Sequence, residues 1–281
     1  MKELFTMWRN TRMIVLVAVT AALYAAVLIP FKGFSIVPGF TEVRPANVIP
    51  VVCSLLFGPA AAWGSAIGNL IGDLVGSTFG PGSLFGFVGN FFFGMIPYVL
   101  WGRLGALSAN EEPNMRSGKN IVEFEIVALV ASVACGLIIA WGLEALKTLP
   151  FAVLGSIIPL NNFIMAAITG PILMALLYDR VKRWGLVWTD IMRPEDIASG
   201  SGALGSWLLV IGSVGGLIVC LGLSLGLGTP LAAAGFALAK NPKYVGSGGV
   251  VIGGGIFVLL LILSLFTARP NTAVGRRRAR A

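Results

Sequence analysis

Charged and amide side chains gather in one stretch of this otherwise apolar chain, between Thr41 and Asp73. The stretch begins with a carboxylate and a guanidinium group, at Glu42 and Arg44, and closes with Asn69 and Asp73. A helix would place these last two side chains one turn apart on the same face. Fixed carboxylates, guanidinium groups and amides can together recognise the donors and acceptors of a small polar solute.

Further amides follow inside apolar segments, at Asn90 and at the pair Asn161 and Asn162. A polar group within a membrane span costs about 2 to 3 kcal/mol on insertion scales, so it usually faces a partner, a cavity or a ligand. Four aromatic residues at nearby heights, Trp63, Phe79, Phe85 and Trp141, are expected to wall such a cavity. The predicted solute-binding residues are Glu42, Arg44, Asn47, Asn69, Asp73, Asn90, Trp141, Asn161 and Asn162.

A purely structural interpretation of the same residues stays open. Asp73 can pair with Arg44, and the asparagines can hydrogen-bond across helices to hold a bundle together. Against that interpretation stands the clustering of these groups at one side of the membrane, beneath an apolar connection over residues 31–47 that is expected to fold back as a cap.

The composition places these groups in a membrane. The chain has 281 residues, of which 57% are hydrophobic and 11% charged, and its mean hydropathy is +0.90. A soluble domain holds about 25% charged residues. The apolar runs are long enough to cross about 30 Å of hydrocarbon as helices, and they lack the alternation of a barrel. We therefore predict an all-α integral membrane protein.

Eight transmembrane helices are expected, at about residues 13–30, 48–57, 60–76, 83–101, 121–143, 151–178, 203–225 and 248–266. The first follows a basic start and is expected to be a retained span rather than a cleaved signal peptide. Residues 1–185 are predicted to form a six-helix domain. Residues 186–202 are a cytoplasmic linker, and residues 203–281 form a two-helix hairpin with a basic tail.

The distribution of Lys and Arg predicts the orientation. With the N-terminus in the cytoplasm, 15 of the 20 basic residues fall on the cytoplasmic side and 5 on the other side. This bias follows the positive-inside rule. Both termini are then cytoplasmic, and the polar cluster lies at the outer side.

Small residues recur at four-residue intervals in three spans. They are Ala18, Ala22 and Ala26 in the first, Gly64, Gly68, Gly72 and Gly76 in the third, and Gly82, Gly86 and Gly94, with Asn90, in the fourth. Such faces let helices approach closely in lipid. The third and fourth spans are predicted to pack backbone to backbone. The alanine face either contacts this protein's own bundle or docks a separate subunit.

Several functions have no support in the sequence. There is no histidine, no metal-ligand spacing, no nucleophile beside a base and no phosphate-binding glycine loop, so neither an enzyme nor a cofactor is expected. The basic residues sit at span ends rather than on one face, which argues against nucleic-acid binding. The three cysteines lie within apolar runs, as small buried residues do. The polar groups do not continue to the cytoplasmic half, so a channel is not evident.

Residues 1–185 resemble the substrate-binding S component of an energy-coupling factor (ECF) vitamin transporter. The matching features are six spans with the N-terminus inside, the alanine face, the turn at Phe57, Gly58 and Pro59, the segment 68–73 and the asparagines opening the sixth span. The last two spans depart from this pattern, because the usual component has six.

The resemblance implies a protein of the prokaryotic cell (inner) membrane that binds a micronutrient at its outer side. It implies docking through Ala18, Ala22 and Ala26 to a transmembrane coupling subunit, which acts with two cytoplasmic ATPases, and closure of the loop over residues 31–47 on the ligand. Carboxylates and amides suit the donor edge of a nitrogen heterocycle, such as a queuosine precursor or a flavin. The alternative is a membrane assembly or scaffold protein that binds no ligand.

Overall fold

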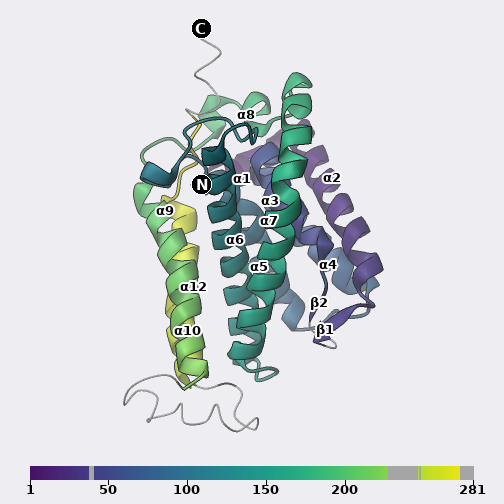
Figure 1. The fold of residues 1–281 in the computed structure, drawn as a ribbon, viewed down its shortest axis with the longest axis vertical. Coiled ribbons are helices and arrows are strands. Elements are labelled where there is room, and N and C mark those ends of the chain that lie inside the picture. The colour runs from purple at the N-terminus through teal and green to yellow at the C-terminus, as the bar shows by residue number, and fades with distance from the viewer. Residues whose placement is uncertain (38–40, 227–245, 247, 273–281) are drawn as a thin grey trace.

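The computed structural model describes residues 1–37, 41–226, 246 and 248–272. Helices dominate this part of the chain, and they run side by side along the long axis of the molecule (Figure 1). The helices are α1 (Glu3–Thr6), α2 (Thr11–Leu28), α3 (Val48–Phe57), α4 (Pro59–Val75), α5 (Gly82–Leu100), α6 (Gly118–Ala145), α7 (Phe151–Arg183), α8 (Trp188–Ile191), α9 (Ala203–Val210), α10 (Gly216–Ser224) and α12 (Gly248–Thr267).

Short elements connect these helices. A π-helical segment, Ile211–Gly215, joins α9 to α10, and single 3₁₀ turns lie at Met7–Arg9, Ile29–Phe31, Pro45–Asn47, Gly105–Leu107 and Pro194–Asp196. Two short strands, β1 (Ser35–Val37) and β2 (Thr41–Glu42), pair antiparallel between α2 and α3. Within the described residues, six helical stretches are long and apolar enough to cross a membrane. The all-α membrane fold predicted from the sequence is confirmed.

The helix boundaries follow local sequence signals. Gly58 ends α3 with a positive φ of 53°, and Pro59 opens α4 at a position where its missing N–H costs little. A Cβ atom at Gly58 would lie 2.5 Å from the ring of Trp188, so glycine is required there for space as well. The predicted turn between the second and third spans is therefore present.

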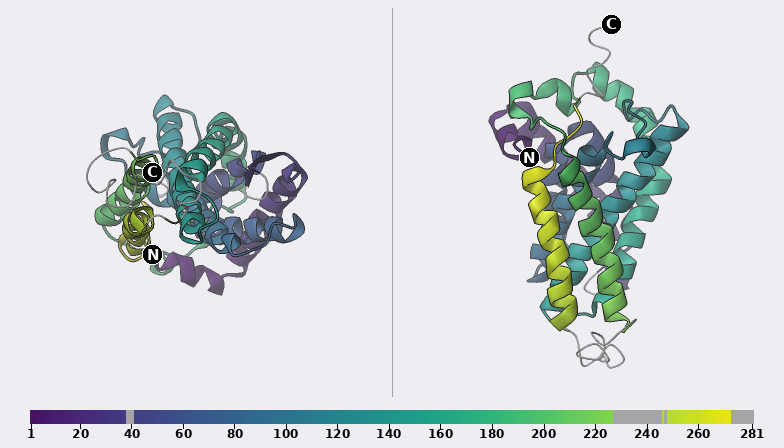
Figure 2. Two further views of the ribbon diagram at one scale, coloured as in Figure 1. Left: turned by 90° about the horizontal axis from the view of Figure 1, so that it is seen from below. Right: turned by 90° about the vertical axis from the view of Figure 1, so that its left-hand side faces the viewer.

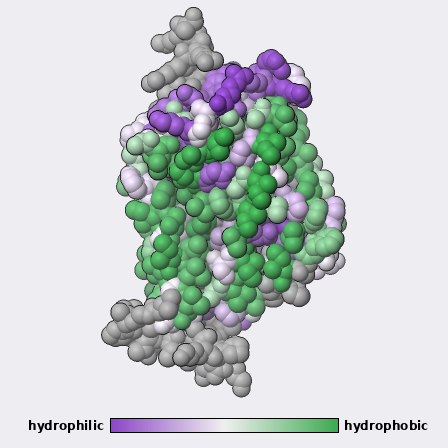
Figure 3. Space-filling view, in the orientation of Figure 1, coloured by the Kyte–Doolittle hydropathy of each residue, from purple (hydrophilic) through white to green (hydrophobic). Residues whose placement is uncertain are grey.

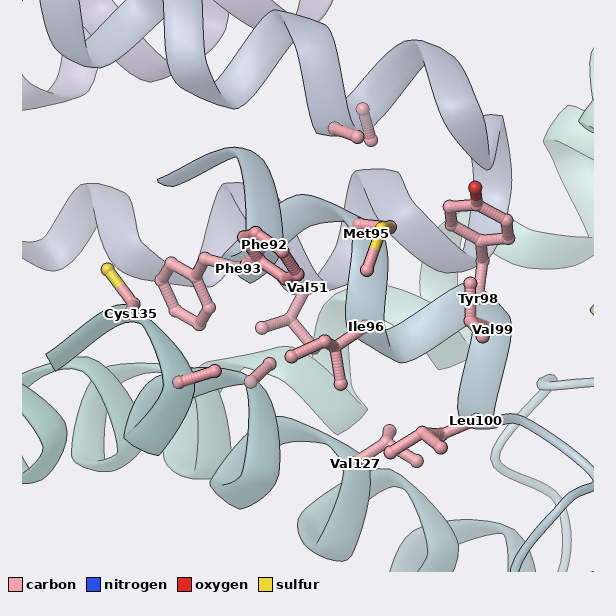
Figure 4. Close-up of a cluster of buried hydrophobic side chains, with 14 of the residues drawn as sticks. Val51, Phe92, Phe93, Met95, Ile96, Tyr98, Val99, Leu100, Val127 and Cys135 are labelled. Atoms are coloured by element: carbon pink, nitrogen blue, oxygen red, sulfur yellow. The ribbon is translucent and has the colours of Figure 1, made fainter. Parts of the chain in front are cut away.

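Helices α5 and α6 occupy the centre of the bundle. In their most apolar stretches, 72% of the residues of α5 and 83% of those of α6 are buried, compared with 22% in α12. Figure 4 shows part of this core, in which Phe92, Phe93 and Ile96 of α5 gather around Val51 of α3, and Val127 of α6 lies near Leu100. A continuous apolar core thus holds the helices that surround the polar cluster.

Helices α4 and α5 pack closely together, as predicted, but the glycine face of α4 packs against α2 and not against α5. A Cβ atom at Gly68 would lie 2.9 Å from the Ala21 carbonyl oxygen, and one at Gly64 would lie 2.5 Å from Cβ of Thr20. Helix α5 does pack on α4, but at Gly94, where an added Cβ atom would lie 2.5 Å from the Ala61 carbonyl oxygen. The inner face of α2 thus occupies the glycine face of α4, and α5 packs on another face of that helix.

The alanine face of α2 points away from the bundle. Ala18, Ala22 and Ala26 are exposed, whereas Ala21 and Tyr24 on the opposite side of the helix are buried. Of the two interpretations left open by the sequence, contact with the protein's own helices does not hold for the described residues. The face is free for lipid or a partner.

The C-terminal hairpin packs along α6 and α7, on the side of the bundle away from α2 (Figures 1 and 2). Trp141 of α6 donates its indole N–H to the Val251 carbonyl at 2.9 Å, and the ring fills the space above Gly254. Ser224 of α10 accepts a hydrogen bond from the Ala152 N–H. The hairpin is therefore joined to the bundle by polar as well as apolar contacts.

Basic residues segregate between the two ends of the molecule. Lys32, Arg44 and Lys147 lie at one end, and the other described basic residues lie at the end that carries α1 and α8, which is the hydrophilic end in Figure 3. The four tail arginines, Lys240 and Lys243 lie outside the described residues. The segregation between ends that the sequence predicts is present. Which end faces the cytoplasm stays a prediction.

Buried acidic residues organise the end that carries α1. Glu123 of α6 accepts backbone hydrogen bonds from Gly102 at 2.6 Å and Ala109 at 2.7 Å, which fixes the loop before α6. Glu3 accepts one from Ala198 at 3.1 Å and ties α1 to the linker over residues 186–202. Burial raises the pKa of the Glu3 carboxyl above its ordinary value.

Candidate solute-binding site

A cavity of about 320 Å³ opens at the end opposite α1, among the connection over residues 31–47 and helices α4 to α7. This volume lies in the range of small-molecule sites. Its lining combines charged, hydroxyl and apolar side chains with glycines: Lys32, Thr41, Glu42, Arg44, Asn69, Asp73, Thr78, Gly80, Pro81, Gly82, Ser83, Gly86, Cys135, Ile139, Leu143, Leu146, Thr148, Ile158 and Asn162.

Five side chains on one wall form a closed ring of polar contacts, which we call the charged ring. Lys32 Nζ lies 3.2 Å from Glu42 Oε1 and 3.1 Å from Asp73 Oδ1. Arg44 Nε lies 3.1 Å from Glu42 Oε1, and its Nη1 donates to Asn69 Oδ1 at 3.1 Å. Asn69 Nδ2 donates to Asp73 Oδ2 at 3.3 Å and completes the ring.

The charged ring is buried and balanced. The side chains of Lys32, Glu42, Arg44 and Asp73 are each between 6% and 12% exposed. Burial is the largest single influence and lowers the pKa of Arg44, but the charge of Glu42 and further nearby groups, Asp73 among them, together outweigh it and the pKa is raised, so the guanidinium stays charged. Two cations and two anions cancel. The wall therefore suits a neutral or zwitterionic solute with hydrogen-bonding edges, because a net charge would disturb buried pairs.

The β-hairpin after α2 positions one half of the charged ring. Pairing of Ser35 with Glu42 across β1 and β2 holds Glu42 beside Lys32. From α7, Asn161 Nδ2 donates to the Glu42 carbonyl at 2.8 Å and anchors β2 on the bundle. The other half comes from α4, where Asn69 and Asp73 lie one helical turn apart.

Amide side chains and one tyrosine extend from the cavity into the bundle, and we call them the amide chain. Asn162 of α7 lines the cavity, and its Oδ1 accepts from Asn47 Nδ2 at 2.6 Å. The Tyr24 hydroxyl of α2 lies 3.0 Å from both Asn47 Oδ1 and Asn90 Oδ1. Asn90 Nδ2 in turn donates to the Gly86 carbonyl at 2.8 Å.

The opposite wall is apolar. Cys135, Ile139 and Leu143 of α6 face the cavity together with Ile158 of α7. Glycine keeps the space open on the α5 side, because a Cβ atom at Gly86 would lie 3.0 Å from Asn69 Nδ2. One face of a solute would therefore meet hydrogen-bonding groups and the other face would meet hydrocarbon and a thiol.

The predicted residues fall into three groups. Glu42, Arg44, Asn69, Asp73 and Asn162 line the cavity. Asn47, Asn90 and Asn161 stand behind the lining and hydrogen-bond to it or to its supports, as described above. Trp141 lies elsewhere, because the hairpin helix α12 takes up its ring and its N–H.

The other expected aromatic walls are absent from the lining of this cavity. Trp63 lies toward the opposite end, where its N–H donates to the Leu4 carbonyl. Phe79 is 62% exposed, and Phe85 packs on Gly142 and Trp141. The prediction failed because heights along helices were considered without knowing which face of each helix turned inward.

Sequence reasoning also missed two central residues. Lys32, one of the five basic residues expected at the outer side, contacts both carboxylates of the charged ring and Thr78. The sequence feature that could have identified Lys32 is its position as a lone charge in an apolar connection. Tyr24 lies within the first span, and no sequence pattern distinguishes it from a core residue. The pairing of Asp73 with Arg44, which the purely structural interpretation allowed, is replaced by pairs of Asp73 with Lys32 and of Arg44 with Glu42.

Comparison with known families decides the broad class of the protein. A family model described as QueT transporter matches residues 14–179, which include the charged ring and the amide chain. The chain belongs to the QueT transporter family. QueT is a family of ECF S components, so the resemblance to S components is confirmed. The match ends before α9. Comparison with curated proteins and with solved structures gave no match.

Proposed function

We propose that this QueT family protein is the solute-binding subunit of a micronutrient uptake system and that the cavity beside the charged ring holds the solute. The cavity itself carries the proposal, because it combines a balanced set of buried donors and acceptors with an apolar wall. A partly planar nitrogen heterocycle, such as a queuosine precursor or a flavin, has the matching edges and faces.

The proposal predicts that purified protein retains one small molecule from a cell extract, which mass spectrometry identifies. Asp73→Ala and Arg44→Ala each remove one side chain of the charged ring and should abolish retention. The exposed pair of Asp179 and Arg116 at the opposite end supplies matched controls, Asp179→Ala and Arg116→Ala, which should retain the molecule. Equal retention by all four folded variants would remove the site assignment, and no retention by the wild type would favour a scaffold protein.

Energy for uptake is proposed to come from a separate module, a transmembrane coupling subunit with two cytoplasmic ATPases. The exposed alanine face of α2 supports this docking role, since a flat face of small residues admits a partner helix closely. Ala22→Leu should prevent co-purification of the coupling subunit and leave solute binding unchanged. The control Leu23→Phe enlarges an exposed residue that lies about 100° around the helix from Ala22, outside that face. Co-purification with Ala22→Leu would refute docking through this face.

A further inference from the structure

The amide chain contains a conflict between donors and acceptors. The Tyr24 hydroxyl has one hydrogen, but two carbonyl oxygens, Asn47 Oδ1 and Asn90 Oδ1, each lie 3.0 Å from it. All three side chains are at most 1% exposed, so bulk solvent does not supply the missing donor. A buried acceptor without a donor carries a desolvation cost.

Only one of the two amides can turn to resolve the conflict. Asn90 Nδ2 donates to the Gly86 carbonyl, which can only accept, so Asn90 is fixed with its oxygen toward Tyr24. Asn47 contacts Asn162, whose amide can turn as well. If both amides rotate by half a turn, each contact joins one donor to one acceptor.

We propose that the protein recognises its solute with the two amides in this rotated arrangement. Asn162 Nδ2 then donates to Asn47 Oδ1, Asn47 Nδ2 donates to the Tyr24 oxygen, and Tyr24 donates to Asn90 Oδ1. The hydrogen bonds run in a single direction from the cavity to the Gly86 carbonyl.

The consequence at the cavity is a defined polarity. Asn162 uses its amide N–H within the chain and turns its carbonyl oxygen toward the cavity, next to the Cys135 thiol. Asn162 therefore accepts a hydrogen bond from an N–H or O–H of the solute. Tyr24, which does not line the cavity, is a positioning residue that acts through Asn47. This inference rests on the proposed function, because it assigns the specificity of the same cavity.

The orientation can be tested without a solute. In protein labelled with ¹⁵N at asparagine, the Asn47 side-chain amide is assigned by its loss in Asn47→Asp. Tyr24→Phe should shift this resonance toward that of a free amide, since its acceptor is removed. The control Tyr98→Phe removes another buried hydroxyl, one that makes no hydrogen bond in the described part of the chain, and should leave the resonance in place. An unchanged Asn47 resonance in Tyr24→Phe overturns the proposal.

Binding of guanine tests whether Asn162 accepts a hydrogen bond from the solute. The 1-methyl and 9-methyl derivatives of guanine each lack one ring N–H, and hypoxanthine lacks the exocyclic amino group. Asn162→Leu should raise the Kd for guanine by roughly 10-fold, the expected effect of an unpaired buried donor. That penalty should vanish for the one probe that lacks the N–H bound by Asn162 and persist for the other two, and a penalty that persists for all three refutes the assignment. If the wild type binds no probe, the proposed heterocycle class fails and the resonance of Asn47 decides the amide chain alone.

Discussion

Lys32 is the residue that joins the two acidic halves of the charged ring. It contacts Glu42 on β2 and Asp73 on α4 while its side chain is only 10% exposed. The positive charge of Lys32 offsets part of the cost of burying these two carboxylates, since an unpaired buried charge is costly. Lys32 therefore holds β2 against α4 as well as shaping the cavity.

Lys32→Ala should lower the free energy of unfolding by about 3 to 5 kcal/mol, the cost of breaking a buried ion pair. Solute binding should be lost in the same variant. Lys32→Met combined with Asp73→Asn removes one charge of each sign and should recover most of the stability, because the pair of Glu42 and Arg44 remains. Thermal unfolding in detergent measures both, with the exposed Lys147→Ala as control. A double variant as unstable as Lys32→Ala would contradict charge balance as the cause.

Residue chemistry made much of the site predictable. Asn69 and Asp73 were placed together because a four-residue spacing fixes a shared helix face, and a charge in an apolar chain marked Glu42 and Arg44. The pairing could not be predicted, because it depends on how the β-hairpin brings Glu42 between Lys32 and Arg44.

At the scale of elements, α2 serves two surfaces at once. Its inner face meets the glycines of α4 through Thr20 and Ala21, and its outer face exposes Ala22 and Ala26. Close approach at the inner face carries Tyr24 into the amide chain. A change in the distance between α2 and α4 would therefore move both the cavity support and the outer face.

Gly68→Ala should destabilise the protein by about 1 to 3 kcal/mol, the usual range for overpacking. The added Cβ would lie 2.9 Å from the Ala21 carbonyl and must push α2 from α4. Gly222→Ala in α10 is the matched control, because a Cβ there meets no atom within 4 Å and alanine favours a helix. Thermal unfolding of the two variants measures the difference, and equal stability would show that the contact yields without cost.

Helix positions were predictable where glycine and proline mark ends, as at Gly58 and Pro59. The helix that packs against each face could not be predicted. The glycines of α4 form a small-residue face in sequence, but both α2 and α5 offer small residues to meet it, and the sequence does not rank them. The same ambiguity of faces misplaced Trp141.

At the scale of the whole molecule, a broad belt of apolar side chains lies below the hydrophilic end that carries α1 and α8 (Figure 3). Lys119 and Lys147 flank the two ends of α6, and both are exposed. The three native cysteines are buried, so a cysteine introduced at either lysine gives a clean label.

With whole cells and a membrane-impermeant maleimide, Lys147→Cys should be labelled and Lys119→Cys should not. The positive-inside rule gives this direction, because basic residues are concentrated at the end that holds Lys119. Both variants should react after the membrane is permeabilised. Labelling of Lys119→Cys alone in intact cells would reverse the orientation and place the cavity in the cytoplasm.

The hairpin of α9, α10 and α12 lies outside the segment matched by the QueT family model, yet it braces the wall of the cavity. Helix α6 contributes Leu143 to the lining, and less than one turn earlier Trp141 is held by α12. Since α6 also forms the apolar wall, displacement of α12 would shift the wall that contacts a bound solute and so change the affinity for it.

Gly254→Ala should test this coupling, because the new Cβ would lie 2.5 Å from Trp141 Cδ1 and 3.0 Å from Cys220 Sγ. We expect a loss of about 1 to 3 kcal/mol in stability and a weaker affinity for the solute. Gly255→Ala is the control, since its Cβ would lie 3.6 Å from the same ring, at ordinary contact distance. Calorimetry of unfolding and of binding separates the two effects. If Gly254→Ala lowers stability but leaves the Kd unchanged, the hairpin supports the bundle without shaping the cavity, because α6 then transmits no displacement to Leu143.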